Sequence, residues 1–244
     1  MDWSRAKTIL IISFALLNGL LGYQLWVSWS EQNSGNTVSL QSVEELNQLL
    51  TAEQIDLQDV LPLDLEKMGY VEVDVTHMDD DWLPLSPRIT IPQTEDSTSE
   101  ITEQLQSQIE QLSDYELDEA ALQRGEWLYY QLIEDVPVFV APVEMRRENN
   151  MLSAYRQTYV EVISKERTST VVSAHAALKA AVEAQLIPAG STVEDVRLGY
   201  IGQLKLEERQ FLVPVWRMNV KGLDPLYINA LTGGIESIEL PSET

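Results

Sequence analysis

The sequence predicts an α+β protein, in which one N-terminal transmembrane helix precedes an extracytoplasmic part made of two helix-on-antiparallel-sheet lobes. Three observations predict it: an uncharged apolar run near the N-terminus, segments with apolar residues at helical spacing, and segments in which apolar and polar residues alternate. We expect a cytoplasmic N-terminus over residues 1–7, a transmembrane helix over 8–29, a tether over 30–39, an acidic lobe over 40–149 and a second lobe over 150–244.

The apolar run near the N-terminus predicts a membrane anchor. It extends over the 20 residues from Thr8 to Val27 without a charge, and at about 1.5 Å per residue it can cross a hydrocarbon layer of roughly 30 Å. Arg5 and Lys7 precede it, so the positive-inside rule places the N-terminus in the cytoplasm and the rest of the chain outside. The alternative is a signal peptide cleaved before Glu31, but its apolar region usually spans only about 7 to 15 residues.

Small residues and one amide share a face of this predicted helix: Ala15, Asn18, Gly19 and Gly22. Small residues let two helix backbones approach closely, and an amide in the middle of a membrane gains a hydrogen bond when it faces another helix. We therefore expect this face to bind a partner helix. The alternative is that it contacts only lipid.

The expected first outer lobe contains both helices and strands. Ser42 with Glu45 three residues later is a capping-box pattern that predicts the start of a helix. Alternation over residues 70–75 predicts a half-buried strand, and three prolines limit residues 82–92 to an edge strand or loop. Apolar residues at helical spacing predict a second helix over residues 94–112.

The expected second lobe is a helix on an antiparallel sheet. The alanine-rich stretch 169–190 is the clearest helix signal in the chain, and strand patterns follow over residues 193–202, 210–220 and 225–230. In the middle strand the apolar residues alternate with polar ones, the latter being Arg217, Asn219 and Lys221. We expect the apolar face to pack on the helix and the polar face to be wet.

Composition excludes several classes of function. The chain has 16 Lys and Arg against 39 Asp and Glu, a formal net charge of -23, which argues against binding nucleic acid or docking on anionic lipid through a basic face. Residues 31–135 alone carry a net charge of -22. Because there is no cysteine, disulfides, thiolate nucleophiles and zinc-thiolate sites are excluded.

The two histidines do not indicate a catalytic or metal site. His77 precedes three consecutive aspartates, but that run lacks the alternate spacing and glycine of a calcium loop, so we expect a solvated acidic turn. His175 lies between Val171 and Leu178 at helical spacing, which favours a position beside the core. Phosphate-binding, zinc-protease and nucleophile-elbow motifs are absent from the sequence. We predict that the protein is not an enzyme and has no catalytic, cofactor-binding or metal-ligating residue.

The N-terminal residues resemble the start of a known family. The resemblance rests on Met1, Asp2, Trp3, Ser4, Lys7, Tyr23 and Gln24, which match the opening of the YycI (WalI) family. The C-terminal segment looks like the end of PepSY-type domains, with Tyr227, Asn229, Thr232 and Gly233 in the matching places.

The resemblance to YycI implies a specific role. Members of that family are single-pass accessory proteins of the WalK–WalR (YycG–YycF) two-component system, which work with the related protein YycH, contact the sensor kinase in the membrane and so alter cell-wall metabolism. The alternative is a membrane-tethered PepSY-like module that binds a peptide or inhibits a peptidase. Neither reading implies a cofactor.

The charge pattern around the anchor generates a topology prediction. Protease added outside intact cells should digest the residues beyond Glu31, because Arg5 and Lys7 hold the N-terminus inside. The measurement is the size of the protected fragment. Recovery of a mature protein that begins at Glu31 would contradict a retained anchor.

Overall fold

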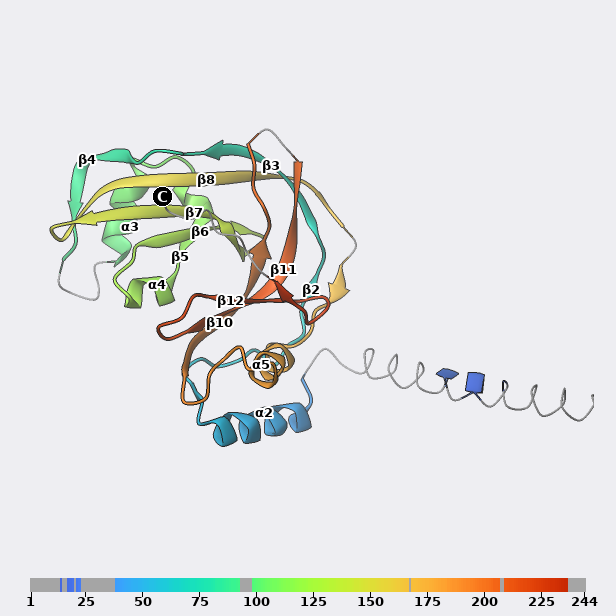
Figure 1. Ribbon diagram of the computed structural model, residues 1–244. Helices are drawn as coiled ribbons and strands as arrows, with labels where there is room; N and C mark the ends of the chain where they lie inside the picture. Colours follow the sequence, from blue (N-terminus) through green and yellow to red (C-terminus); the bar gives the residue numbers. More distant parts are fainter. Residues whose placement is uncertain are drawn as a thin grey trace, which may run out of the picture. The chain divides into compact units, whose positions relative to one another are not determined.

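Figure 1 shows the chain as a computed structural model. It describes residues 14, 17–19, 21–22, 38–92, 98–166, 168–206 and 209–236. Contacts divide the chain into two compact units, residues 1–37 and 38–244.

The larger unit confirms the predicted α+β class, since it combines one large sheet with few helices. The main path of this 11-stranded sheet follows the order β1 (Asp56–Leu57), β10 (Thr192–Ile201), β11 (Arg209–Val220), β3 (Val71–Met78), β8 (Met151–Lys165), β7 (Val136–Glu148), β6 (Leu128–Ile133) and β5 (Tyr115–Leu117). Off this path, β12 (Leu226–Asn229) pairs with β11 and β13 (Ile235–Glu236), and β4 (Leu83–Thr90) pairs with β8. A separate small sheet joins β2 (Lys67–Met68) to β9 (Ser169–Thr170).

The sheet bends back on itself where β10 meets β7. Most neighbouring strands are antiparallel, but Tyr200 of β10 lies parallel to Val138 of β7, so β10, β11, β3, β8 and β7 form a closed circuit. Gly199 permits this approach, because a Cβ there would lie 2.7 Å from the carbonyl oxygen of Pro137 and would collide with the ring of Phe139.

Strands β7 and β8 form a long hairpin near the middle of the sequence. Asn149 and Asn150 at its turn both have positive φ angles, 48° and 62°, which asparagine tolerates better than most residues. The expected lobe boundary at residues 149 and 150 falls at this turn, and both strands that flank it belong to the same sheet.

The helices of the larger unit do not follow the predicted bounds: those expected over residues 94–112 and 169–190 are shorter, and the one expected from Ser42 starts at Leu40. They are α2 (Leu40–Glu53), α3 (Thr98–Gln106), α4 (Glu119–Gln123) and α5 (Ala174–Glu183), with a 3-10 turn η2 (Leu112–Asp114). The predicted capping box at Ser42 is wrong, because the cap of α2 is Ser39, whose side chain accepts a hydrogen bond from the backbone N–H of Ser42. Ser173 caps α5 in the same way, which starts that helix later than the alanine-rich stretch suggested.

The edge-strand prediction for residues 82–92 is confirmed. Within the described residues β4 pairs with β8 alone, and its pairing is interrupted between Pro84 and Ile89. Where the pairing is interrupted, the side-chain amide of Gln108 binds the backbone of β4. Its Oε1 accepts from the N–H of Ser86 at 2.7 Å, and its Nε2 donates to the carbonyl of Pro87 at 3.1 Å.

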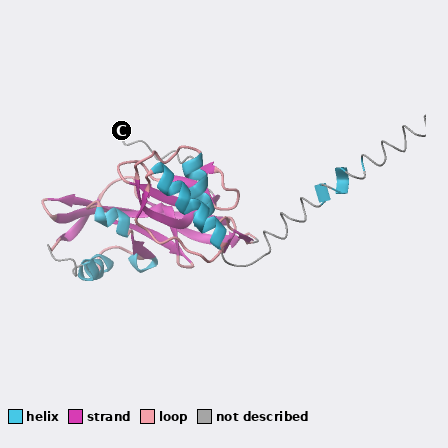
Figure 2. Cartoon of the chain, turned by 90° about the horizontal axis from the view of Figure 1, so that it is seen from below, coloured by secondary structure: helices cyan, strands magenta, loops and turns pink. Residues whose placement is uncertain are grey.

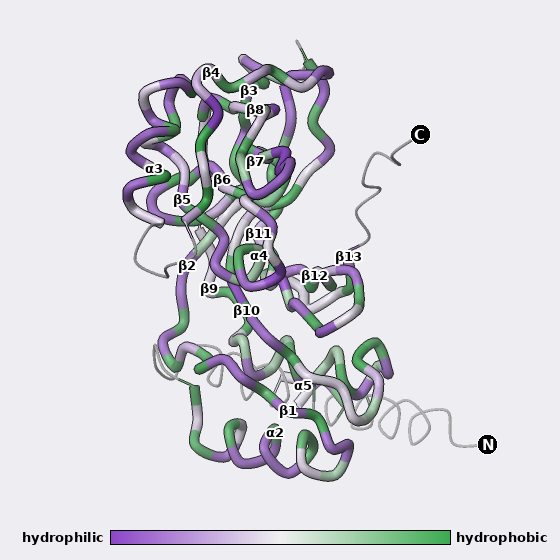
Figure 3. Tube along the Cα trace, turned by 90° about the vertical axis from the view of Figure 1, so that its left-hand side faces the viewer, coloured by the Kyte–Doolittle hydropathy of each residue, from purple (hydrophilic) through white to green (hydrophobic). Residues whose placement is uncertain are grey.

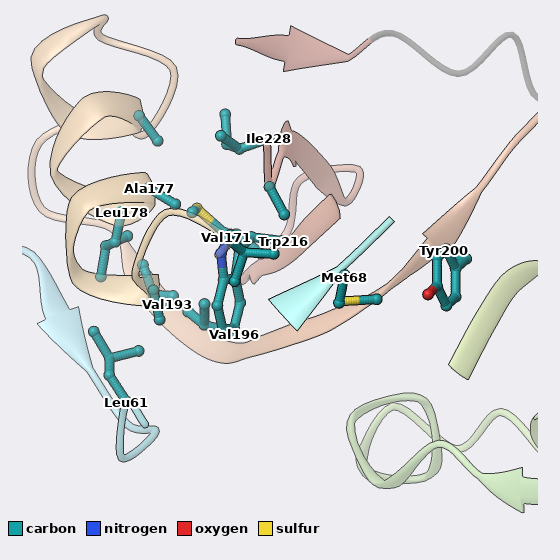
Figure 4. Close-up of a cluster of buried hydrophobic side chains, with 14 of the residues drawn as sticks. Leu61, Met68, Val171, Ala177, Leu178, Val193, Val196, Tyr200, Trp216 and Ile228 are labelled. Atoms are coloured by element: carbon teal, nitrogen blue, oxygen red, sulfur yellow. The ribbon is translucent and has the colours of Figure 1, made fainter. Parts of the chain in front are cut away.

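Helices cover the sheet at two places and define two apolar cores. Helices α2 and α5 lie side by side and cover one face of the sheet (Figures 1 and 2), and hydrophobic and hydrophilic residues alternate along α2 (Figure 3). Their core includes Leu46, Leu178 and Trp216, and Figure 4 shows Val171, Ala177 and Leu178 gathered near Trp216. Helix α3 covers the second core through Ile101 and Leu105. The first core draws residues from both sides of the β7–β8 turn, with Val73 and Val138 before it and Val193 after it.

A buried glutamine bridges the place where β8 parts from β7. The two strands pair only from Val143 opposite Gln157 to the hairpin turn. Beyond that point Gln131 of β6 donates from Nε2 to the carbonyl of Val160 at 2.7 Å and accepts from the Val160 N–H through Oε1 at 2.9 Å. Its side chain is 4% exposed, so one amide replaces the missing strand at this position.

Substituting Gln131 by alanine should therefore destabilise the fold. The change leaves the buried N–H and C=O of Val160 without partners, for a loss of about 2 to 4 kcal/mol of unfolding free energy at roughly 1 to 3 kcal/mol per group. Urea unfolding of the full chain measures it. Gln123→Ala is the matched control, because Gln123 is exposed and its loss should stay within about 0.5 kcal/mol. Equal losses for both variants would contradict the bridging role.

Candidate functional site

The predicted partner-binding face lies in the smaller unit, where the structure describes Asn18, Gly19 and Gly22 but not Ala15. Asn18 donates from Nδ2 to the carbonyl oxygen of Phe14 at 3.0 Å, one helical turn earlier. An asparagine amide has two N–H donors and one acceptor oxygen, and among the described residues the second N–H and Oδ1 of Asn18 have no partner. A Cβ at Gly19 or Gly22 would meet no atom within 4 Å.

The predicted transmembrane helix over residues 8–29 falls largely outside the described residues. Within the described part of the chain, no helix has the length and hydrophobicity needed to cross a membrane. The anchor and its partner-binding face stay predictions.

A buried ionic cluster lies in the larger unit, centred on Arg217 of β11. Its guanidinium makes two parallel hydrogen bonds to Asp118, Nη1 to Oδ2 at 2.8 Å and Nη2 to Oδ1 at 3.0 Å. Nη2 also donates to Oδ2 of Asp195 in β10 at 2.9 Å, and Asn219 donates to the same oxygen at 3.1 Å. One cation thus holds two carboxylates from separate elements.

Aromatic rings enclose the cation. The guanidinium carbon of Arg217 lies 4.5 Å from the centre of the Phe139 ring and 5.4 Å from that of Tyr130, and these rings meet edge to face. Burial works to lower the pKa of Arg217, but the hydrogen bonds and charge of Asp118 outweigh it and raise that pKa further. The cation therefore stays charged, although its Nε is buried without a partner in the described part of the chain.

This cluster corrects the prediction that the polar face of residues 210–220 would be wet. Arg217 is 1% exposed and Asn219 is 4% exposed, because the aromatic residues of β6 and β7 and the start of α4 cover that face. Asp118 stands at the N-cap position of α4, but its carboxylate makes no capping bond and binds Arg217 instead. A ligand from solvent cannot reach the paired Arg217 and Asp118, so the cluster joins elements of the fold and is not a binding site.

The two histidines occupy different environments. His77 is half-exposed and lies 2.9 Å from a carboxylate oxygen of Asp79, whose other oxygen accepts from the backbone N–H of Gln157. His175 lies at the core side of α5, and desolvation lowers the pKa of its imidazole. The described residues contain no group of three or more ligand-type side chains that could hold a metal ion.

The larger unit also has an open cavity of about 520 Å³ between β6 and β8. It is lined by residues 131–134 of one segment and by Tyr159, Val160, Glu161, Val162 and Lys165 of the other. A salt bridge of 2.6 Å between Lys165 and Glu134 lies beside it. Sequence reasoning did not find this cavity, because it depends on where β8 separates from β7.

Comparisons with known proteins identify a family. A family model described as YycI protein matches residues 33–231. A comparison with curated protein sequences gave no match. Among solved structures, an uncharacterized protein from Eubacterium rectale is similar, with 12% identity, a TM-score of 0.35 and a match that covers 47% of this chain and 43% of the other. The PepSY-like resemblance of the C-terminal segment stays a prediction.

The ionic cluster generates a stability prediction. Arg217→Met should lower the unfolding free energy by about 3 to 5 kcal/mol, because it leaves the buried carboxylate of Asp118 without its cation. Urea unfolding at neutral pH measures the loss, and Arg209→Met is the control, since Arg209 is 65% exposed and its surface pair is worth less than about 1 kcal/mol.

A double variant separates charge from packing. Arg217→Met combined with Asp118→Leu removes the stranded carboxylate, so it should be more stable than Arg217→Met alone. Asp118→Leu is also measured alone. If it lowers the unfolding free energy of Arg217→Met by as much as it lowers that of the unchanged chain, the two residues act independently and the ion pair is not what makes Arg217 necessary.

Proposed function

Because the chain belongs to the YycI family, whose members are regulatory accessory proteins of the YycG (WalK) histidine kinase system, we propose that it acts as a membrane-anchored modulator of that kinase. Its N-terminal helix crosses the membrane once, with the N-terminus in the cytoplasm and the domain that begins at Val38 outside. The observation that carries the proposal is the family match, which extends over most of the outer domain.

The membrane helix supplies one contact with the kinase. Asn18, Gly19 and Gly22 lie on the predicted small-residue face, and within the described residues the amide of Asn18 has an N–H and an oxygen beyond its bond to Phe14. In a membrane such groups are best satisfied by a neighbouring helix, which the glycines allow to approach closely. This supports a helix of the sensor kinase as the partner.

The outer domain supplies a second contact, made together with a YycH-like accessory protein. Its net negative charge argues against nucleic acid and anionic polymers as partners, and the described residues hold no metal cluster. A role in protein–protein recognition, with consequences for cell-wall metabolism, agrees with both features.

Regulation follows from differential binding. If the chain binds one signalling state of the kinase more tightly than the other, it shifts the equilibrium between the states by the difference in binding free energy. A coupling of about 1 to 3 kcal/mol, typical of allosteric systems, changes the ratio of the two states by about 5- to 150-fold. This mechanism requires no covalent bond of the chain to form or break.

Substitution of Gly19 tests the helix contact. Gly19→Ile places a branched side chain in the proposed contact and should reduce membrane crosslinking between the chain and the kinase, without changing insertion. Leu20→Ile, about 100° away around the helix, should have almost no effect. Asn18→Leu should weaken association only modestly, since interhelical hydrogen bonds in membranes average about 0.6 kcal/mol.

The readouts are crosslinking yield and the output of a kinase-controlled reporter. If Gly19→Ile and Leu20→Ile both leave these unchanged, the helix is only a tether and the outer domain carries the interaction.

A further inference from the structure

Strand β8 has an edge that changes partner along its length. On one side it pairs with β3 from Met78 opposite Thr158 to Val71 opposite Lys165. On the other side it pairs with β7, but within the described residues that pairing ends at Gln157. Figure 1 shows β7 between β8 and β6. The segment of β8 after Gln157 therefore has one edge without a partner strand.

Side chains occupy the first two positions along this edge. The carbonyl of Thr158 accepts from the Tyr115 hydroxyl at 2.6 Å, and the N–H and C=O of Val160 bind the amide of Gln131. Since backbone groups alternate sides along a strand, the N–H and C=O of Val162 point to the same side of β8 as those of Val160. The pairing with β3 is regular from Val160 to Val162, so this alternation holds. Among the described residues no side chain reaches Val162 as Gln131 reaches Val160.

The opposite wall of the cavity is also a strand edge without a partner. Strand β6 pairs with β7 along one side, and on the other side β5 reaches only as far as Gln131. Leu132 and Ile133 lie beyond that point and line the cavity of about 520 Å³ together with Val162. The cavity thus lies between two open edges, with the Gln131 bridge at one end and the Lys165–Glu134 salt bridge beside it.

The residues around the cavity indicate which kind of partner could bind there. Val162 and Ile163 are 41% and 42% exposed, which offers apolar surface to a neighbour. Glu134, Asp135 and Glu161 are exposed acids near it, whereas the described residues that line the cavity include one base, Lys165, which is paired with Glu134. A second copy of this chain, with its net charge of -23, suits such a rim poorly.

We propose that this cavity binds an extended segment of another protein, in which aliphatic residues alternate with Lys or Arg, as an added strand on β8. The segment pairs through its backbone with the N–H and C=O of Val162, its aliphatic side chains contact Val162 and Leu132, and its basic side chains face Glu134 and Glu161. The inference goes beyond the proposed function, which gives the outer domain a contact but names no residues for it, and it assigns that domain a defined recognition site.

Hydrogen exchange with three synthetic peptides tests the site. The full ¹⁵N-labelled chain in detergent micelles is titrated with acetyl-Lys-Val-Lys-Val-Lys-amide, with its Glu-Val-Glu-Val-Glu counterpart and with Lys-Val-Pro-Val-Lys, in which the central residue lacks an N–H. Only the first peptide should slow exchange of the Val162 amide, by about tenfold or more near saturation. Added salt should weaken this effect.

Two variants locate the effect. Glu161→Lys should lower the affinity for the Lys peptide, whereas the matched control Glu53→Lys, at the exposed end of α2, makes the same change in net charge and should not. Val162→Pro removes an N–H that does not bond to β3 and should abolish binding. If Val162→Pro fails to fold, Glu161→Lys still decides the question.

Several results would overturn the proposal. They are unchanged exchange at Val162 up to the solubility limit of the Lys peptide, equal protection by all three peptides, or equal effects of Glu161→Lys and Glu53→Lys. Protection that rises with the concentration of the chain alone would assign the site to a second copy instead. Because no kinase is present, these results do not depend on the proposed function.

Discussion

The pairing of Arg217 with Asp118 is the interaction on which the arrangement of the sheet most depends. A cation that is 1% exposed can exist only where carboxylates compensate it, and here they come from the start of α4 and from β10. This requirement fixes β11 against β10 and brings α4 over the same face. The aromatic residues that enclose the guanidinium, Phe139 and Tyr130, belong to β7 and β6, so the cluster joins the two halves of the chain.

The same cluster explains where sequence reasoning succeeded and where it failed. Local patterns predicted the α+β class, the alanine-rich helix and the edge strand at residues 82–92, because helical spacing and proline act within a few residues. Alternation in β11 correctly placed Trp216 and Met218 in the core but assigned Arg217 to solvent. The charge of the buried Arg217 is compensated by a carboxylate 99 residues away in the chain, and a single sequence does not reveal such a pairing. A lone base within an apolar strand was the available signal.

The turn at Asn149 and Asn150 also depends on context that the sequence pattern does not contain. The boundary between the two expected lobes falls at these residues, which form a tight hairpin turn with positive φ angles between two strands of one sheet. The cavity beside Val162 was beyond sequence reasoning, since it arises from strands that separate after Gln157 and from a glutamine side chain that substitutes for one of them. The partner-binding face of Ala15, Asn18, Gly19 and Gly22 stays a prediction, which rests on the spacing of small residues along a helix.

In this account the chain acts by binding, through an outer domain whose elements the Arg217 cluster joins and through the membrane segment proposed to contact the kinase. The most direct measurement is the autophosphorylation rate of the YycG-type kinase in proteoliposomes, recorded while the amount of the full chain is raised at constant kinase. The account predicts a rate that changes and then saturates as each kinase acquires its partner. A rate that stays constant, with the chain inserted in the same vesicles in excess over the kinase, would contradict it.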